Sequence, residues 1–175
     1  GAGNMGGALA RGWAGTGKHR VTVTARSAAT LSQYATVPPA AQPGGGPAPA
    51  ASHPIADCPA PAAQSSAYCP ASAGMHAIAT SLDNVSAVRD ADIIVLAVKP
   101  WLVESVCRQI AGAVDFDRQM ILSVAANVFT DTLRDYLGNE QAKVFYVMPN
   151  IAAEYCESMT YLAAASGIAD DDIAI

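Results

Sequence analysis

The sequence predicts an α/β protein built on a doubly wound parallel sheet, and three observations support this prediction. A glycine-rich segment opens the chain and runs directly into a helical pattern. Apolar runs of strand length alternate with segments of helical spacing from residue 78 onward. Two of these runs, 92–98 and 120–124, are almost continuously apolar, as is typical of parallel strands covered on both faces. Strands that alternate with helices in this way form parallel sheets through right-handed crossovers.

The opening segment has the pattern G-x-G-x-x-G, with its glycines at Gly1, Gly3 and Gly6. In this pattern the first glycine allows a tight turn, the second lets a pyrophosphate approach the backbone, and the third lets the helix pack closely on a strand. The helix N-terminus adds free N–H groups and a positive dipole end. A strand normally precedes the pattern, and none is visible before Gly1. We therefore expect a dinucleotide site of the Rossmann type whose first strand is missing from this chain.

The other elements follow from local spacing and from residues that start or end helices and strands. The expected helices are 4–13, 28–34, 81–88, 101–113 and 130–137, and the expected strands are 21–24, 92–98, 120–124, 143–148 and 159–164. Ser27 is a suitable N-cap for the second helix. Gly138 is a suitable C-cap for the helix before it, and Pro149 ends a strand.

A segment of different composition interrupts the chain at about 37–77. It contains nine of the eleven prolines, and Asp57 is its only charged residue. Proline at this density removes backbone donors and blocks helices and central strands. We expect an irregular insertion without chemistry, inside one dinucleotide-binding domain that spans 1–165.

Composition and charge exclude several classes of function. The net charge is −5 with only ten Lys and Arg residues, which argues against a nucleic-acid partner. No apolar run approaches the roughly 18 residues of a membrane span, so we expect no membrane association. The four cysteines form no CxxC pair, and we predict no metal site. Scattered thiols fit a reducing compartment, so the expected location is cytoplasmic.

Ligands of doubly wound sheets bind outside the carboxyl ends of the strands. The candidate residues there, in addition to the opening Gly1, Ala2, Gly3, Asn4, Met5 and Gly6, are Arg26, Ser27, Ala97, Val98, Lys99, Pro100, Ala125, Ala126, Asn127 and Asn150. Lys99 either reaches the cofactor or belongs to a turn in solvent. The side-chain amide of Asn150 is in a position to face a nicotinamide. No Ser/His/Asp set or carboxylate pair stands out, so no catalytic residue is predicted.

The end of the second strand of such a domain selects the cofactor. An acidic residue there would hold the ribose 2′-hydroxyl of NAD, but Arg26 and Ser27 occupy this position. A guanidinium and a hydroxyl bind a 2′-phosphate well. The sequence therefore favours NADPH and leaves NADH possible. The alternative is that Arg26 simply faces solvent.

Five segments taken in order resemble the amino-terminal domain of pyrroline-5-carboxylate reductase: GAGNMGGALARG at 1–12, ADIIVLAVKP at 91–100, SVAA at 123–126, VMPN at 147–150 and ESMT at 157–160. The resemblance implies reduction of 1-pyrroline-5-carboxylate to L-proline by a hydride from NAD(P)H, the last step of proline biosynthesis. It implies that residues 1–6 bind the pyrophosphate and that Arg26 and Ser27 hold the adenosine phosphate. It also implies that Asn84 lies near the adenosine, and that 97–100 and 125–126 line the nicotinamide side.

The chain departs from the family pattern near the expected nicotinamide pocket. Asn127 and Cys156 stand where the family has glycine, Phe129 where it has a small or hydroxyl residue, and Ile151 where it has threonine. The family's helical second domain, which forms the dimer and holds the substrate, is also absent, and 166–175 is expected to begin the linker or helix leading to it. We therefore expect a homo-oligomeric parent protein, and negligible reductase activity for this chain alone.

Two other functions remain open from the sequence. One is another NADP-dependent reductase of the β-hydroxyacid dehydrogenase type, whose catalytic lysine lies in the second domain. The other is a non-catalytic nucleotide-binding module, which the altered pocket residues favour. Fold alone does not decide between them.

Overall fold

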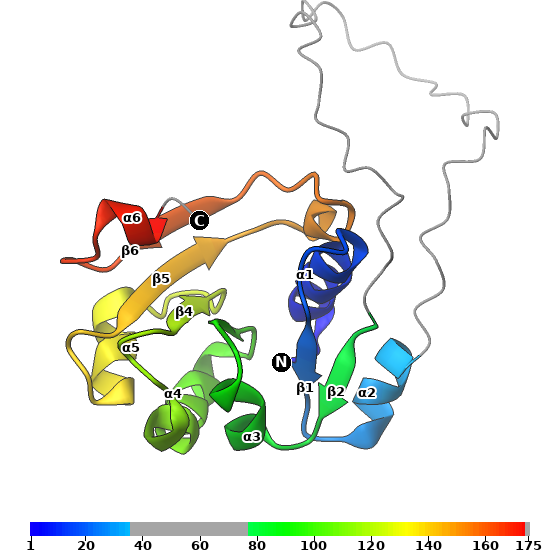
Figure 1. The fold of residues 1–175 in the computed structure, drawn as a ribbon, viewed down its shortest axis with the longest axis horizontal. Helices are drawn as coiled ribbons and strands as arrows, with labels where there is room; N and C mark the ends of the chain where they lie inside the picture. The colour runs from blue at the N-terminus through cyan, green and yellow to red at the C-terminus, as the bar shows by residue number, and fades with distance from the viewer. Residues whose placement is uncertain (36–76, 174–175) are drawn as a thin grey trace, which may run out of the picture.

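The computed structural model describes residues 1–35 and 77–173 (Figure 1). The insertion expected at 37–77 lies outside the described residues apart from Ala77. The helices are α1 (Asn4–Gly15), α2 (Ala28–Ala35), α3 (Asn84–Arg89), α4 (Pro100–Ile110), α5 (Thr130–Leu137) and α6 (Asp170–Ile173), with 3-10 turns η1 (Ala111–Ala113) and η2 (Ile151–Tyr155). The strands are β1 (Thr22–Thr24), β2 (Ala79–Ser81), β3 (Ile93–Leu96), β4 (Met120–Ser123), β5 (Lys143–Met148) and β6 (Tyr161–Ala164).

The strands of the described residues form two sheets, which α3 connects along the chain (Figure 1). β1 pairs with β2 in parallel, and Thr24 lies opposite Ser81. β3, β4 and β5 are parallel neighbours in that order, and β6 pairs antiparallel with β5. The α/β class and its parallel strands are as expected from the sequence, whereas the reversed direction of β6 is a new finding.

The division between the sheets falls where the glycine-rich segment enters the fold. The carbonyl of Val21, just before β1, faces β2 and accepts a hydrogen bond from the Ala79 N–H at 2.9 Å. The carbonyl of Asp92, just before β3, likewise faces β4 and accepts a hydrogen bond from the Met120 N–H at 3.0 Å. The backbone groups of alternate residues, such as Thr22 in β1, therefore face the other edge of each strand. Among the described residues, no strand pairs with these edges.

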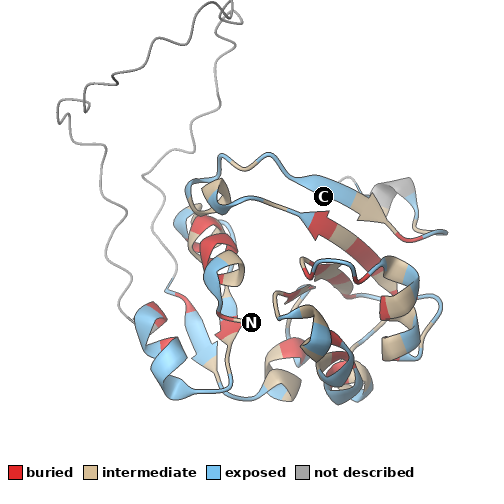
Figure 2. Ribbon diagram, turned by 180° about the vertical axis from the view of Figure 1, so that it is seen from behind, coloured by how far each residue is buried: buried red, intermediate tan, exposed pale blue. Residues whose placement is uncertain are grey.

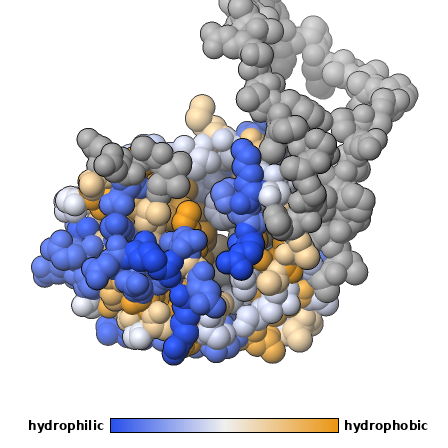
Figure 3. All heavy atoms as spheres, in the orientation of Figure 1, coloured by the Kyte–Doolittle hydropathy of each residue, from blue (hydrophilic) through white to orange (hydrophobic). Residues whose placement is uncertain are grey.

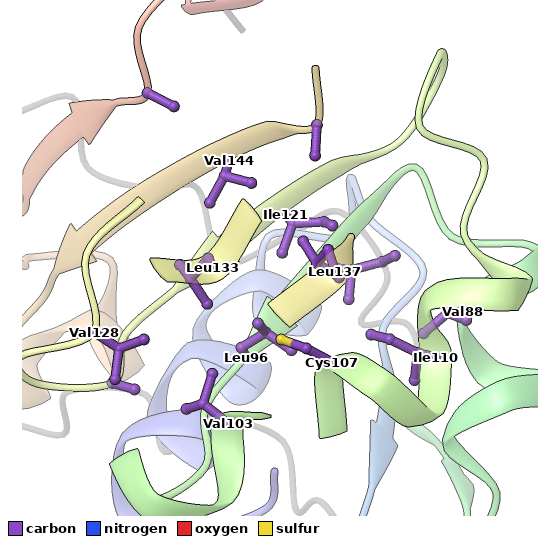
Figure 4. Close-up of a cluster of buried hydrophobic side chains, with 14 residues drawn as sticks. Val88, Leu96, Val103, Cys107, Ile110, Ile121, Val128, Leu133, Leu137 and Val144 are labelled. Atoms are coloured by element: carbon purple, nitrogen blue, oxygen red, sulfur yellow. The ribbon is translucent and has the colours of Figure 1, made fainter. Parts of the chain in front are cut away.

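The main hydrophobic core lies between the β3–β6 sheet and the helices α4 and α5 (Figure 4). Val103 and Cys107 from α4, Leu133 from α5 and Ile121 from β4 are all completely buried. Burial of each large apolar side chain contributes about 1.5–3 kcal/mol. It also raises the pKa of the Cys107 thiol to about 11, so this cysteine acts as a packing group.

The exposed faces of α4 and α5 carry charged residues. In Figure 2 the buried residues gather on the sheet and on the inner faces of the helices. In Figure 3 hydrophilic side chains cover the region of α3, α4 and α5. One of them, Arg108, pairs with Glu104 one turn earlier at 2.9 Å. Within the described ranges, no helix is long and apolar enough to cross a membrane.

Helix α3 begins later than the sequence predicts, because residues 79–81 form a strand. The Asp83 carboxylate accepts hydrogen bonds from the Val85 N–H at 2.9 Å and the Ser86 N–H at 3.2 Å. These bonds cap the helix at Asn84 and lower the pKa of Asp83. The expected helix start at Ser81 is therefore wrong. Residues 79–81 are too short and polar to signal a strand, which exists because β1 offers an edge.

The predicted helix ends are confirmed where capping residues set them. The Ser27 hydroxyl accepts a hydrogen bond from the Thr30 N–H at 3.3 Å at the start of α2. Gly138 follows α5 with φ of +67°, the left-handed conformation of a helix C-cap. The helix expected at 101–113 divides into α4, which starts at Pro100, and the 3-10 turn η1.

Candidate dinucleotide-binding site

The glycine-rich loop folds tightly against the end of β3. A Cβ at Gly1 would lie 3.0 Å from the Ala97 carbonyl carbon and from Val98 Cγ1, and closer still to the Ala97 oxygen. A Cβ at Gly6 would lie 2.9 Å from Ala97 Cβ and 3.2 Å from the Gly1 carbonyl carbon. Both positions therefore require glycine, because backbone passes directly against backbone there.

Gly3 differs from the other two glycines of the loop because it faces open space. A Cβ at Gly3 would meet no heavy atom within 4 Å, and its φ of −78° and ψ of −173° suit any residue. Gly3 is also the N-cap of α1, and no side chain caps this helix. The first helical hydrogen bond is donated by the Gly7 N–H to the Gly3 carbonyl at 2.7 Å. The first-turn N–H groups are therefore available to an anion.

The ends of β3 and β4 present small residues beside this loop. Ala97 and Val98 follow β3, Ala125 follows β4 and is 2% exposed, and Ala126 is exposed. Pro100 is the first residue of α4, and Lys99 is its exposed N-cap. The structure brings Ala97 and Val98 against the glycine loop and leaves Lys99 in solvent.

Arg26 and Ser27 follow β1, in the other sheet, and both are exposed. Among the described acidic side chains, none forms an ion pair with Arg26. The Ser27 hydroxyl caps α2 and lies 3.0 Å from the Thr30 hydroxyl. Asn84 begins α3, and its amide nitrogen donates to Gln109 Oε1 at 3.0 Å. The Asn84 amide is thus engaged with α4, whereas the Arg26 guanidinium is available.

Asn150 follows β5 and is the N-cap of η2, and its polar groups are used within the protein. Its Oδ1 accepts from the Ala152 N–H at 3.0 Å, and its own N–H donates to Ser158 Oγ at 3.0 Å. The Nδ2 atom lies at the long distance of 3.5 Å from the Met159 carbonyl oxygen. One N–H of the amide is therefore only weakly engaged within the chain.

Two of the four departures from the family pattern occupy left-handed backbone. Asn127 and Cys156 both have φ of +60°, and they are the non-glycine residues with positive φ in the described part of the chain. Glycine takes this conformation without cost, asparagine tolerates it, and other residues are disfavoured by roughly 1–2 kcal/mol. The other two departures, Phe129 and Ile151, are 60% and 58% exposed. Phe129 stacks at a tilt on Tyr146, with ring centroids 5.7 Å apart.

A separate cavity of about 360 Å³ lies between α1 and the β3–β6 sheet. Apolar side chains including Leu9, Trp13 and Leu122 line most of it, and none of the predicted cofactor-binding residues does. It is therefore distinct from the region around Gly3. In the described residues, no group of three or more His, Cys, Asp or Glu side chains is placed to hold a metal.

Four residues near the loop were missed by sequence reasoning. Tyr34 is 2% exposed and donates a hydrogen bond to the Ala2 carbonyl at 3.2 Å. Arg11 and Gly12 of α1 and Glu154 of η2 form a contact between segments more than 140 residues apart. A glycine inside a helix lowers helix stability by up to about 1 kcal/mol relative to alanine. Gly12 was therefore the one feature of the sequence that indicated a close backbone contact at this point of α1.

These features define the class of the protein: an α/β domain with a glycine-rich loop and an uncapped helix suited to a dinucleotide. A family model described as "NADP oxidoreductase coenzyme F420-dependent" matches residues 60–127. Pyrroline-5-carboxylate reductase of Methanosarcina acetivorans is 35% identical over 96 residues, which cover 55% of this chain and 35% of the relative. The Pseudomonas aeruginosa enzyme is 33% identical over 122 residues, covering 59% and 44%.

Solved structures give the same assignment of the fold. Pyrroline-5-carboxylate reductase from Coxiella burnetii aligns with a TM-score of 0.69 and 22% identity, covering 99% of this chain and 51% of that one. The Plasmodium falciparum enzyme, solved with NADP bound, aligns with a TM-score of 0.66 and 18% identity, covering 99% and 49%. The chain is thus similar in sequence, over part of its length, to pyrroline-5-carboxylate reductases, and it shares the fold of the solved ones, as the motifs indicate. It spans about half the length of these solved proteins, and the matches cover 31–44% of the first five curated relatives.

Proposed function

We propose that this chain is the cofactor-binding half of a pyrroline-5-carboxylate reductase, and that it binds NADPH across the glycine loop. The observation that carries the proposal is the open space at Gly3 in front of the uncapped first turn of α1. A pyrophosphate placed there would accept hydrogen bonds from backbone N–H groups and sit at the positive end of the helix. The similarity to the named pyrroline-5-carboxylate reductases supports the choice of family.

The proposed contacts divide the dinucleotide between the two sheets. The pyrophosphate is assigned to residues 1–6, and the adenosine 2′-phosphate to Arg26 and Ser27, with Asn84 nearby. The nicotinamide side is assigned to 97–100, to 125–126 and to Asn150. The absence of an acidic partner for Arg26 among the described residues supports NADPH over NADH, because the guanidinium keeps its full capacity for a phosphate.

When bound, NADPH supplies the hydride that reduces the carbon–nitrogen double bond of 1-pyrroline-5-carboxylate. The residues of this chain bind and orient the dinucleotide, and the small residues after β3 and β4 leave room for a flat ring beside the backbone. Hydride transfer also requires a substrate held in the right geometry. We assign substrate binding, and also the formation of a homo-oligomer, to the part of the relatives that this chain does not match. We further propose that the full-length protein acts in the cytoplasm.

Substituting Gly3 tests the site without changing the fold. In the substitution Gly3→Val the added side chain enters open space, so the free energy of unfolding should fall by no more than about 1 kcal/mol, the cost of a poorer N-cap residue. The same side chain would block the pyrophosphate, so NADPH binding to the chain, followed by NADPH fluorescence, should be lost. Gly15→Val is the matched control, because Gly15 also lies in open space, at the far end of α1. Equal binding by Gly3→Val and the wild type would refute the site.

The cofactor preference rests on Arg26 and is tested at that residue. Arg26→Ala should weaken NADPH binding about tenfold or more, the range of hydrogen bonds to charged groups, and leave NADH binding unchanged. Equal loss for both cofactors would mean that Arg26 contributes only general charge. The reaction itself is tested on the full-length protein by NADPH oxidation with 1-pyrroline-5-carboxylate, with NADH in parallel.

A second candidate function is a nucleotide-binding module without turnover. It is favoured by Asn150, whose Oδ1 already accepts from the Ala152 N–H, and by the exposed Phe129 and Ile151 at the pocket. This candidate predicts NADPH binding by the full-length protein without oxidation of NADPH in the presence of the substrate. Turnover would exclude it.

A further inference from the structure

The 3-10 turn η2 packs directly on helix α1, although the two lie at opposite ends of the chain (Figure 1). A Cβ at Gly12 would lie 3.1 Å from the Ala153 carbonyl carbon and closer to its oxygen, so the two backbones touch. The Cys156 thiol, just after η2, donates to the Gly12 carbonyl at 3.6 Å. This contact sets the position of the segment that Asn150 begins.

A bidentate ion pair stabilises the contact between α1 and η2. Arg11 Nε lies 2.6 Å from Glu154 Oε1, and Arg11 Nη2 lies 3.0 Å from Glu154 Oε2. Both side chains are about 30% exposed. The planar guanidinium matches the carboxylate with two parallel hydrogen bonds, which fixes orientation as well as distance. The hydrogen bonds from Arg11 lower the pKa of Glu154, so the pair is charged at neutral pH.

The same arginine also reaches the glycine loop through Tyr34. The Arg11 guanidinium lies beside the Tyr34 hydroxyl, which donates a hydrogen bond to the Ala2 carbonyl at 3.2 Å. Gly7 makes this possible, because a Cβ there would lie 2.6 Å from the Tyr34 oxygen and 3.1 Å from Arg11 Nη1. Arg11 therefore lies between the Tyr34 hydroxyl, which is bonded to Ala2, and the Glu154 carboxylate.

We infer that Arg11 and Glu154 are positioning residues that hold the Asn150 segment in register with the glycine loop, so that one dinucleotide meets both. The inference rests on the proposed function, which places the pyrophosphate at the loop and the nicotinamide near Asn150. Neither side chain is assigned a contact with the cofactor. They act through the 150–156 segment and through Ala2.

The first test measures the dissociation constant of the 175-residue chain for NADPH by fluorescence. Glu154→Gln removes the charge pair and should weaken binding about threefold to tenfold, the range for a partly screened bidentate pair. Arg11→Lys keeps the positive charge but loses the bidentate geometry, so it should weaken NADPH binding less than Glu154→Gln does. Glu104→Gln is the matched control, because it breaks the Glu104–Arg108 pair on α4 and should leave the dissociation constant unchanged. Unchanged binding by Glu154→Gln would overturn the inference.

The second test needs no cofactor and separates this inference from the proposed function. Hydrogen exchange at the amides of Cys156 and Glu157, which donate to Ala153 and Ala152, reports the order of the segment. Glu154→Gln should speed exchange at these amides several-fold and leave the buried Leu133 amide unchanged. If the wild type fails to bind NADPH, the proposed function fails, and exchange alone decides whether the pair orders the segment. Unchanged exchange in Glu154→Gln would refute the positioning role whatever the cofactor result.

Discussion

The contact between α1 and η2 makes a sharp prediction for the substitution Gly12→Ala. The added Cβ would lie 3.1 Å from the Ala153 carbonyl carbon, 3.5 Å from Glu154 Cα and under 3.0 Å from the Ala153 oxygen. Ordinary contacts between carbon atoms lie at about 3.5–4.0 Å, so η2 has to move away from α1 by roughly 0.5–1 Å. Both partners are backbone, so no side-chain rotation relieves the overlap.

One stabilising and two destabilising contributions set the size of the change. Alanine in place of a helical glycine gains up to about 1 kcal/mol of helix stability. Inserting a methyl group into a packed contact costs about 1–3 kcal/mol. Loss of the Arg11–Glu154 geometry adds up to about 1 kcal/mol, since the pair is partly exposed. We therefore expect a net destabilisation of about 1–2 kcal/mol.

Urea unfolding followed by circular dichroism measures this change, and thermal unfolding should show a midpoint lower by roughly 2–8 °C. Gly15→Ala is the control, because a Cβ at Gly15 meets nothing within 4 Å and Gly15 ends the same helix. It should leave the stability unchanged or raise it by a few tenths of a kcal/mol. If Gly12→Ala were as stable as Gly15→Ala, the close packing of η2 on α1 would be refuted.

Two further predictions concern η2 and the residue that follows it. Cys156 has φ of +60°, so Cys156→Gly should unfold with a free energy about 1–2 kcal/mol higher than Cys156→Val; equal values in urea unfolding would contradict the left-handed conformation. The lowered pKa of Glu154 means that its pairing stabilises the fold fully above the ordinary glutamate pKa of about 4.3 and loses this effect as the pH falls through the folded value. The difference in unfolding free energy between wild type and Glu154→Gln should therefore be constant above about pH 5 and shrink toward pH 3. Asp83, whose pKa is also lowered, titrates in both proteins and cancels from this difference; a difference that stays constant down to pH 3 would exclude the pair as its source.

The glycine loop was the part of the candidate site that the sequence described best. Its spacing predicted that Gly1 allows a tight turn, that Gly3 faces a ligand and that Gly6 lets the helix pack closely, because the motif extends over only six residues. The structure then packs Gly1 and Gly6 against backbone and leaves Gly3 open. The capping positions Ser27 and Gly138 were equally predictable, since capping depends on neighbours three or four residues away.

Elements with weak local signals were not predictable. Residues 79–81 form a strand through pairing with β1, and 54 residues separate Thr24 from Ala79. A local sequence pattern cannot indicate a pairing over this distance. The reversed direction of β6 depends on the turn at η2, which ends with a left-handed Cys156 in place of the glycine that would have signalled it.

The sequence by itself therefore determined the α/β class, most helices and strands, and the position of the glycine-rich loop, because periodicity, capping and glycine spacing act over a few residues. Only the tertiary structure decided the division into two sheets, the direction of β6 and the pairing of Arg11 with Glu154. These features depend on contacts between residues far apart in the chain, 143 positions in the case of the ion pair. Such contacts form when whole elements pack, and the sequence around one residue of the pair does not indicate which residue is its partner.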